Sequence, residues 1–305
     1  MNAVANHGYV ARNGYTNTQE AITAIMKVYG VGPTIADGLA TIAAVQAGDG
    51  FHFSIGGPAP ATLPVLGGLL GLYDLPGRAT VNPNYDVNLL GNAAVNRYHQ
   101  SVSQNPYYFR GFFGFTIPPG THAFIYRMFS NKSVEYPEGF LDRNTLKSFY
   151  GITGEGDSLK YTPGTERIPN NWYTHAIDDP YSAPFFFSDF KNLIQQHPEL
   201  SAFGGNTGTV NSFTGIDITN LTGGLYNAET LLQGNNLGCF LFQSLAVAAP
   251  DTIRGAGVIA DIAGAVAKIN NAVGQILDGL GCPEPSRYDY DDSQLAKYPG
   301  YTKLR

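Results

Sequence analysis

The chain has 305 residues, of which 43% are apolar, so it can bury a large hydrophobic core. Charged residues make up only 14% of it, below the roughly 25% of an average soluble protein. The formal net charge is −6 and Lys and Arg form no cluster, which argues against nucleic acid as a partner. Because no uninterrupted apolar run reaches the ~18 residues of a membrane span, we also expect no transmembrane helix.

The N-terminal fifth of the chain favours two helices. Asn17 precedes Glu20 by three residues, which is the spacing of a capping box, and apolar residues then recur at helical spacing up to Tyr29. A second helix is expected over 31–48, after a Gly-Pro break. Residues 49–92 are rich in Gly and Pro and predict irregular structure.

The rest of the chain is also mainly helical in pattern. Apolar periodicity predicts helices over 93–104, 141–152, 182–200, 228–249 and 251–281, and Asp142 is the expected cap of the helix over 141–152. Residues 120–131 fit a buried helix or a short strand, and we favour the helix. Between them, residues 204–227 are rich in Gly, Thr and Asn and predict a long loop. With no alternating strand pattern, we expect an all-α fold in a single domain over 1–305, with 285–305 as a peripheral polar tail.

Two features favour a secreted protein. The sequons Asn131-Lys132-Ser133 and Asn220-Leu221-Thr222 are N-glycosylation acceptors, and the Lys content is low. Residues 1–20 hold no apolar stretch of the kind found in signal peptides. A processed secreted chain and an intracellular protein therefore both stay open, and the sequons favour the first.

The opening stretch "NAVANHGYVARNG" (2–14) resembles the fungal chloroperoxidase-like family of haem-thiolate peroxidases and peroxygenases. Its members typically have Pro-Cys-Pro, two more residues, Asn-x-x-Ala-Asn/Ser-His-Gly-Tyr and an Asn/Asp-Gly turn. Further segments are similar along the chain, among them "LDRNTLKSFYGITG" (141–154) and "TPGTERIPNNWY" (162–173). The resemblance implies an all-helical fold around haem b and an H₂O₂-dependent oxidation or oxygenation of a small apolar substrate or a halide.

The resemblance also assigns a haem-side loop. It comprises Asn2, Ala5, Asn6 and His7, and the family's axial cysteine would lie just before Met1, outside this sequence. A thiolate in that position favours O–O cleavage by electron donation. In the family, the His of this motif belongs to a structural turn, which we expect for His7; direct ligation of the iron is the less favoured alternative.

The two cysteines of the chain, Cys239 and Cys282, lie far from this loop, in predicted C-terminal helices. We expect a disulfide between them, which would stabilise the fold by about 4 kcal/mol in a chain-entropy model. One of them serving as the axial ligand is a much weaker alternative.

A Mg²⁺ motif of the family, Glu-Gly-Asp or a variant followed by Ser, aligns best with "NPNYDVNLL" (82–90). Asn84 then takes the Glu position, Asp86 matches, and Asn88 takes the Ser position. Because a hard cation prefers carboxylate oxygens and only one remains, the pattern predicts a weakened or lost site. The literal "GEGDS" (154–158) is expected to be an acidic surface turn instead.

The family's distal acid–base residue, usually Glu, precedes the "LD…SF" segment. In this chain, that stretch is the helix predicted over 120–131, where the nearest titratable side chain is His122. A His can shuttle a proton near neutral pH, although a lone His on an apolar helix is more often a packed core residue. Glu135 is the alternative catalytic candidate, or else a surface carboxylate, and Arg127 would orient the acid or form an ordinary ion pair.

These observations leave three functions open. The first is a peroxidase or peroxygenase whose axial ligand lies outside the sequence. The second is a degenerate relative that binds an apolar small molecule without haem-thiolate chemistry. The third is a secreted scaffold without catalysis. Several phenylalanines would line an apolar channel or simply form core: Phe112, Phe113, Phe115, Phe124 and 185–187.

Overall fold

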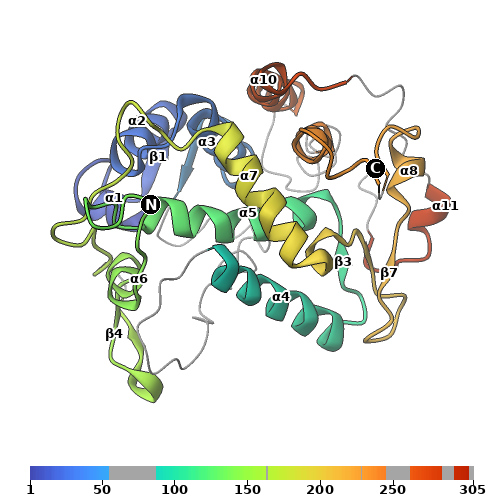
Figure 1. Ribbon diagram of the computed structural model, residues 1–305, viewed down its shortest axis with the longest axis horizontal. Helices are drawn as coiled ribbons and strands as arrows, with labels where there is room; N and C mark the ends of the chain where they lie inside the picture. Colours follow the sequence, from blue (N-terminus) through green and yellow to red (C-terminus); the bar gives the residue numbers. More distant parts are fainter. Residues whose placement is uncertain (55–86, 163, 228, 245–261, 284–291, 302–305) are drawn as a thin grey trace.

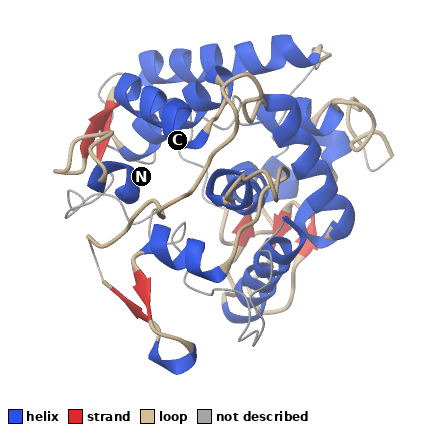
Figure 2. Cartoon of the chain, turned by 60° about the vertical axis from the view of Figure 1, so that its left-hand side comes forward, coloured by secondary structure: helices blue, strands red, loops and turns tan. Residues whose placement is uncertain are grey.

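The computed structural model describes residues 1–54, 87–162, 164–227, 229–244, 262–283 and 292–301. Helices dominate these residues (Figure 2), and the strands among them are short and form two pairs and one three-stranded sheet. This confirms the mainly helical fold predicted from the sequence. Figure 1 shows α5 (Phe112–Phe129) in the middle of the molecule, in contact with α4 (Val87–Gln104) and α7 (Ala183–Gln196).

The N-terminal region begins with α1 (Asn2–Asn6) and β1 (Tyr15–Asn17), followed by α2 (Thr18–Tyr29) and α3 (Pro33–Ala47). The predicted cap is present, because Asn17 Oδ1 accepts a hydrogen bond from Glu20 N at 2.9 Å. Strand β2 (His52–Ser54) pairs antiparallel with β1. The two predicted helices are thus confirmed, and the β1–β2 pair joins the residues just before α2 to those after α3.

Helices α4 and α5 begin earlier than the sequence predicts. The prediction placed the start of α5 after Pro118 and Pro119, but both residues lie inside the helix. Pro118 has no N–H to donate to the carbonyl of Gly114, and Arg110 Nε donates to that oxygen instead, at 3.1 Å. The buried Arg110 side chain therefore replaces a helix hydrogen bond, which a pattern of residue types does not reveal.

The next elements are α6 (Arg143–Tyr150), capped by Asp142 as expected, and a hairpin formed by β4 (Ile152–Thr153) and β5 (Lys160–Tyr161). After α7 comes the 3₁₀ helix η4 (Pro198–Ser201). The predicted loop over 204–227 contains more structure than expected. Two of its segments join β3 in a three-stranded sheet and a short helix follows: β3 (Phe109–Arg110), β6 (Gly204–Gly205), β7 (Thr214–Gly215) and α8 (Ile218–Leu221).

The C-terminal region comprises a helix over 236–244, α10 (Ile262–Leu280) and α11 (Asp292–Leu295). The expectation of a peripheral tail is wrong for the described part of it. Leu295 and Tyr298 are 0% and 2% exposed, and Tyr298 Oη donates to the carbonyl oxygens of Thr214 and Gly215. An apolar residue and an aromatic ring anchor an otherwise polar segment, so its average composition was misleading.

The core is unusually aromatic where α5 meets α7. Phe124 stacks on Phe186 with ring centroids 4.9 Å apart, and Phe115 and Phe190 are fully buried. A second cluster joins the start of α4 to α5 and α6 through Leu90, Ile125, Tyr126, Leu141 and Leu146. Phe185 is 43% exposed, and the side chains of Phe112 and Phe113 lie outside the described part. Packing is thus the observed role of the described core phenylalanines.

Candidate functional site

Helix α1 is held from two sides. Ala3, Val4 and Ala5 are buried in the main core, whereas Asn2 and Asn6 face residues 164–168, called here the connecting segment. Asn6 Nδ2 donates to the carbonyl oxygen of Glu166 at 2.8 Å, and Asn2 Nδ2 donates to its side-chain Oε1 at 3.1 Å. Three of the four residues predicted for the haem-side loop therefore either pack in the core or bind this segment.

His7, the fourth residue, ends α1 and contacts the same segment. Its Nε2 accepts a hydrogen bond from the backbone N of Ile168 at 3.1 Å. Since this bond uses the ring's acceptor nitrogen, it gives His7 a structural position in the turn. Gly8 follows with a φ of 79°, a left-handed conformation that glycine adopts without strain.

The most buried acid of this region is Glu166, which is 4% exposed. Besides Asn2, its Oε1 accepts a hydrogen bond from Tyr161 Oη at 3.0 Å. Burial alone would raise the pKa of Glu166, but the hydrogen bonds it accepts outweigh this effect and leave the pKa below its ordinary value. Glu166 is therefore a carboxylate that keeps its charge while surrounded by neutral donors.

Alternate residues of the connecting segment contact opposite neighbours. Glu166 and Ile168 bind α1, as described above. Arg167 N donates to the carbonyl of Ser148 on α6 at 2.8 Å, and Ser148 Oγ returns a bond to the carbonyl of Arg167. Thr165 Oγ1 reaches the carbonyl of Gly151 at the end of α6. The segment thus joins α1 to α6.

The chain beyond this segment also reaches α5. Trp172 Nε1 donates to the carbonyl of Phe129, the last residue of α5, at 2.8 Å. The indole also packs edge-on against Phe149 of α6 and Tyr29 of α2. Residues 164–172 therefore link the haem-side loop on α1 to the helix that carries His122.

His122 is half-buried in the middle of α5. Its Nδ1 lies 2.6 Å from the carbonyl of Pro118, which fixes Nδ1 as the protonated nitrogen of the neutral ring and leaves Nε2 as the acceptor. Burial lowers the pKa of His122, and the bond to Pro118 opposes this only in part. Ile125 and Tyr126, one turn later, pack against Leu90 at the start of α4, close to the predicted Mg²⁺ motif.

The other acid–base candidates lie elsewhere. Glu135 is exposed in the loop after α5. Arg127 forms two bonds of 2.7 and 2.8 Å with the buried carboxylate of Asp189, which also accepts from Tyr181 Oη. The guanidinium is thereby held in an ion pair between α5 and α7 rather than beside His122.

The predicted Mg²⁺ ligands fall largely outside the description. Asn84 and Asp86 lie in the segment 55–86, and only the backbone of Asn88 is described, in the first turn of α4. Within the described ranges, no group of three or more His, Cys, Asp and Glu side chains is arranged to hold a metal. The structure therefore neither supports nor contradicts this assignment.

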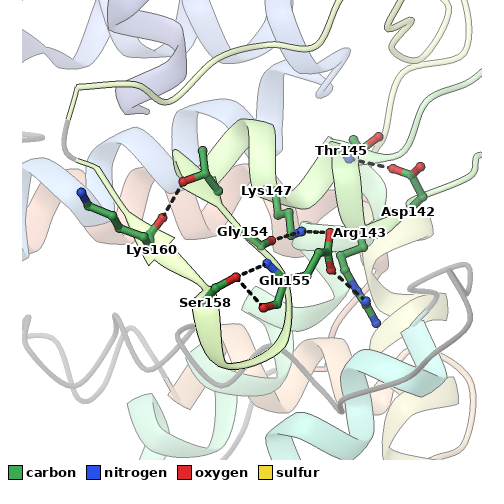
Figure 3. A network of polar contacts seen from close by, with 9 residues as sticks. Asp142, Arg143, Thr145, Lys147, Gly154, Glu155, Ser158 and Lys160 are labelled. Atoms are coloured by element: carbon green, nitrogen blue, oxygen red, sulfur yellow. Dashed lines mark hydrogen bonds and ion pairs between the residues drawn. The ribbon is translucent and has the colours of Figure 1, made fainter.

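The literal "GEGDS" sequence forms an exposed turn at the tip of the β4–β5 hairpin, in and beside the 3₁₀ helix η3 (Gly156–Ser158). Figure 3 shows Glu155 bound by Lys147 and Arg143 from α6. Its carboxylate is therefore engaged by cations of the chain itself. This is the acidic surface turn that we expected.

Cys239 and Cys282 form a disulfide, with Cα atoms 5.4 Å apart. Neither sulfur is a thiolate, and the 305 residues contain no other cysteine. Because His7 Nε2 is also engaged, the residues present do not fit the axial ligand set of a haem-thiolate centre.

The two sequon asparagines lie in different surroundings. Asn131 is partly buried, and its Oδ1 accepts from Tyr173 N at 2.9 Å. Asn220 lies in α8, and its side chain is outside the described part.

The sequence analysis found the stretch 162–173 similar to the family but assigned no role to Glu166. No local signal marks this residue, because two of its partners, Asn2 and Asn6, lie some 160 positions earlier in the chain. The Pro-flanked context of the segment predicts extended backbone, but not which neighbour each residue contacts.

Comparisons with known proteins identify the family of the chain. The family model described as "Peroxidase, family 2" matches residues 1–75, which include α1. The dothistromin biosynthesis peroxidase dotB of Dothistroma septosporum is 41% identical over 337 aligned positions, covering 99% of this chain and 80% of the relative. The aromatic peroxidase fscJ of Fusarium equiseti is 34% identical, with 93% and 74% covered. The chain therefore belongs to the fungal chloroperoxidase-like family, peroxidase family 2.

Proposed function

We propose that this peroxidase-like oxidoreductase uses H₂O₂ to oxidise or oxygenate a small apolar substrate, or to oxidise a halide. The observation that carries the proposal is the link between α1 and α5. The loop characteristic of the family and the helix with the candidate acid–base residue are joined through residues 164–172. Two relatives that cover most of the chain are named peroxidases, and one of them an aromatic peroxidase.

In this proposal, His122 moves the proton of the peroxide. Pro118 holds the Nδ1 proton, so Nε2 accepts a proton from one peroxide oxygen and returns it to the other. The O–O bond then breaks so that one oxygen leaves as water, while the other passes to the substrate or halide, which supplies the two electrons. The lowered pKa keeps the ring neutral at neutral pH, which is the state that a base requires.

A test of this role replaces His122 by Ala and follows H₂O₂-dependent oxidation of an aromatic reductant. Loss of a positioned acid–base group should reduce kcat about 10²- to 10⁴-fold. His99→Ala is a matched control, because His99 is exposed on α4. Equal activity of the two variants would assign His122 to packing.

For the cofactor, the residues of the chain supply less support than for the type of reaction. The family resemblance implies haem b, but the disulfide removes both cysteines of this chain as thiolate donors. A haem-thiolate centre would thus need a ligand other than the residues described. A Mg²⁺ beside it would depend on Asn84, Asp86 and Asn88, of which one is a carboxylate.

The disulfide also favours a second candidate function, binding of an apolar small molecule without haem-thiolate chemistry. One experiment separates the two. The chain is expressed with haem supplied, alone and with a Pro-Cys-Pro segment added before Met1, and absorption spectra are recorded oxidised and then reduced with CO. A red-shifted, thiolate-type Soret band in the extended form alone supports the enzyme. Absence of any Soret band from both forms would favour the binding protein.

We further propose that the protein is secreted. The disulfide and the two sequons support this, because disulfides persist in oxidising compartments. Expression in a fungal host followed by enzymatic deglycosylation tests it. A mobility shift that disappears in Asn131→Gln or Asn220→Gln is the expected result, and an unglycosylated protein retained in the cell would contradict it.

A further inference from the structure

We propose that Glu166 is a positioning residue that fixes where α1 lies on the connecting segment. The proposal rests on the proposed function, because α1 carries the loop by which the family is recognised. Glu166 is not a catalytic residue in this account. It acts through Asn2 and Asn6, the two polar residues that α1 turns toward it.

The first argument is that the carboxylate is buried and fully engaged. Glu166 is 4% exposed, and its Oε1 accepts from Asn2 Nδ2 at 3.1 Å and from Tyr161 Oη at 3.0 Å. Its Oε2 lies 3.4 Å from Asn6 Nδ2. A buried charge without partners would be costly, so its retention here requires this donor set.

The second argument is the direction in which these donors come. Tyr161 belongs to the β4–β5 hairpin, whereas Asn2 and Asn6 are one helical turn apart on the same face of α1. A single carboxylate thus binds both ends of a five-residue helix. Helices this short are not stable on their own, so α1 depends on such contacts for its conformation.

The third argument is that, within the part of the chain that the structure describes, Glu166 is the side chain that binds both ends of α1. Asn6 also donates to the carbonyls of Gly164 and Glu166, and His7 accepts from Ile168, but these bonds hold only the C-terminal end. The side chain of Asn2, at the start of α1, donates its hydrogen bond to Glu166 of the connecting segment. Loss of the carboxylate should therefore loosen the start of α1 without releasing its end or unfolding the core.

Hydrogen exchange detected by mass spectrometry tests this directly. In Glu166→Ala, amides of residues 2–10 should exchange about tenfold faster, while those of α7 stay unchanged. Glu166→Gln keeps a carbonyl acceptor and should restore part of the protection. Glu229→Ala is the control, because Glu229 is exposed far from α1 in the sequence.

Unchanged exchange over residues 2–10 would overturn the proposal, and so would a uniform increase along the chain. Should Glu166→Ala fail to fold, Asn2→Ala removes the same anchor from the other side and should give the same local increase.

A kinetic measurement adds a readout that mere stability does not move. Peroxidase assays below the unfolding temperature should show kcat reduced at least tenfold in Glu166→Ala, with KM for the reductant nearly unchanged and partial rescue in Glu166→Gln. Faster exchange with an unaltered kcat would overturn the positioning role. A wild-type chain without peroxidase activity would defeat the proposed function instead, and the exchange result would still decide whether Glu166 positions α1.

Discussion

Two glutamates eleven positions apart have opposite surroundings. The side chain of Glu155 is 66% exposed, and its partners are the cations Lys147 and Arg143 of the neighbouring helix. Glu166 is 4% exposed, and its partners are neutral donors: Asn2 from the distant start of the chain, and Tyr161 from the neighbouring hairpin. Glu155 lies in a stretch that resembles a metal motif, whereas Glu166 lies in a stretch that is similar to the family but was given no metal or catalytic role.

The difference shows which acid the architecture depends on. An exposed ion pair contributes little, because solvent screens the charges and two long side chains lose conformational freedom. A buried carboxylate that accepts several hydrogen bonds leaves unsatisfied donors behind when it is removed. The exposed Glu155 is therefore expected to matter less for stability than Glu166, which joins α1, the β4–β5 hairpin and the connecting segment.

The largest loss of stability is expected at a third carboxylate, that of Asp189. Asp189 is paired with Arg127 between α5 and α7, and its side chain is 6% exposed. Arg127→Ala should lower the free energy of unfolding by about 3 kcal/mol in urea denaturation, because it leaves a buried charge unpaired. Arg97→Ala, on the exposed side of α4, should have little effect. A loss below about 1 kcal/mol for Arg127→Ala would contradict the argument.

The next largest loss of stability is expected where Thr162 contacts the end of α6. Gly151 ends that helix with a φ of 63°, and a Cβ there would lie 3.0 Å from the carbonyl oxygen of Thr162. Gly151→Ala should cost about 2–3 kcal/mol, part from the left-handed backbone and part from the crowding. Gly164→Ala separates the two, since φ is 82° but no atom lies within 4 Å. Equal losses of unfolding free energy in the two variants would show that crowding at Gly151 contributes nothing.

Substitution of the two glutamates compared above, Glu166 and Glu155, should cause smaller losses of stability, and the two losses should differ. Glu166→Ala should lower the free energy of unfolding by about 1–2 kcal/mol, because Asn2 and Tyr161 lose their acceptor. Glu155→Ala should leave the thermal midpoint essentially unchanged. Both are measured by thermal and urea unfolding at pH 7. Equal destabilisation would show that burial does not distinguish the two acids.

The smallest predicted effect concerns pH. Burial, with Lys132 and Arg127 nearby, lowers the pKa of His175 to about 4, against an ordinary value of 6.5, and Asp179 opposes this only in part. The unfolded chain therefore binds a proton that the folded chain does not, so stability falls as the pH drops from about 6.5 towards 4. Between pH 7 and pH 5, the loss should be about 1 kcal/mol after a discount for solvent screening.

The same titration separates His175 from Glu166. The pKa of Glu166 is below its ordinary value, so the stabilisation from its charge is lost only at lower pH. His175→Gln should remove the slope between pH 7 and pH 5. A slope that persists in this variant would assign it to other groups.

Much of the helical framework could be predicted from residue patterns. Asn17 and Asp142 were identified as caps because their local sequence contains the acceptor and the spacing. The starts of α4 and α5 were missed because their stability comes from tertiary contacts, including the bond from Arg110 that compensates for Pro118. The buried Leu295 and Tyr298 were missed for a related reason, since the core partners of a polar segment cannot be inferred from its composition.

The family of the protein could be predicted from its sequence, whereas the residues of the candidate site could be predicted only in part. The N-terminal stretch identified the family, and His122 was recognised as the titratable group on α5. Glu166 was not predicted, because its importance depends on residues about 160 positions away in the sequence. Local spacing carries no information on such contacts.

The account depends on a direct energetic link between Glu166 and α1, which a double-mutant cycle measures. Asn2→Ala and Glu166→Ala, alone and combined, should show a coupling energy of about 1 kcal/mol in unfolding free energy. The equivalent cycle of Arg143→Ala and Glu155→Ala should show little coupling, because the Glu155 side chain is 66% exposed and its contact with Arg143 is 3.4 Å long. Additive effects of Asn2→Ala and Glu166→Ala would contradict the account, since each residue would then act independently of the other.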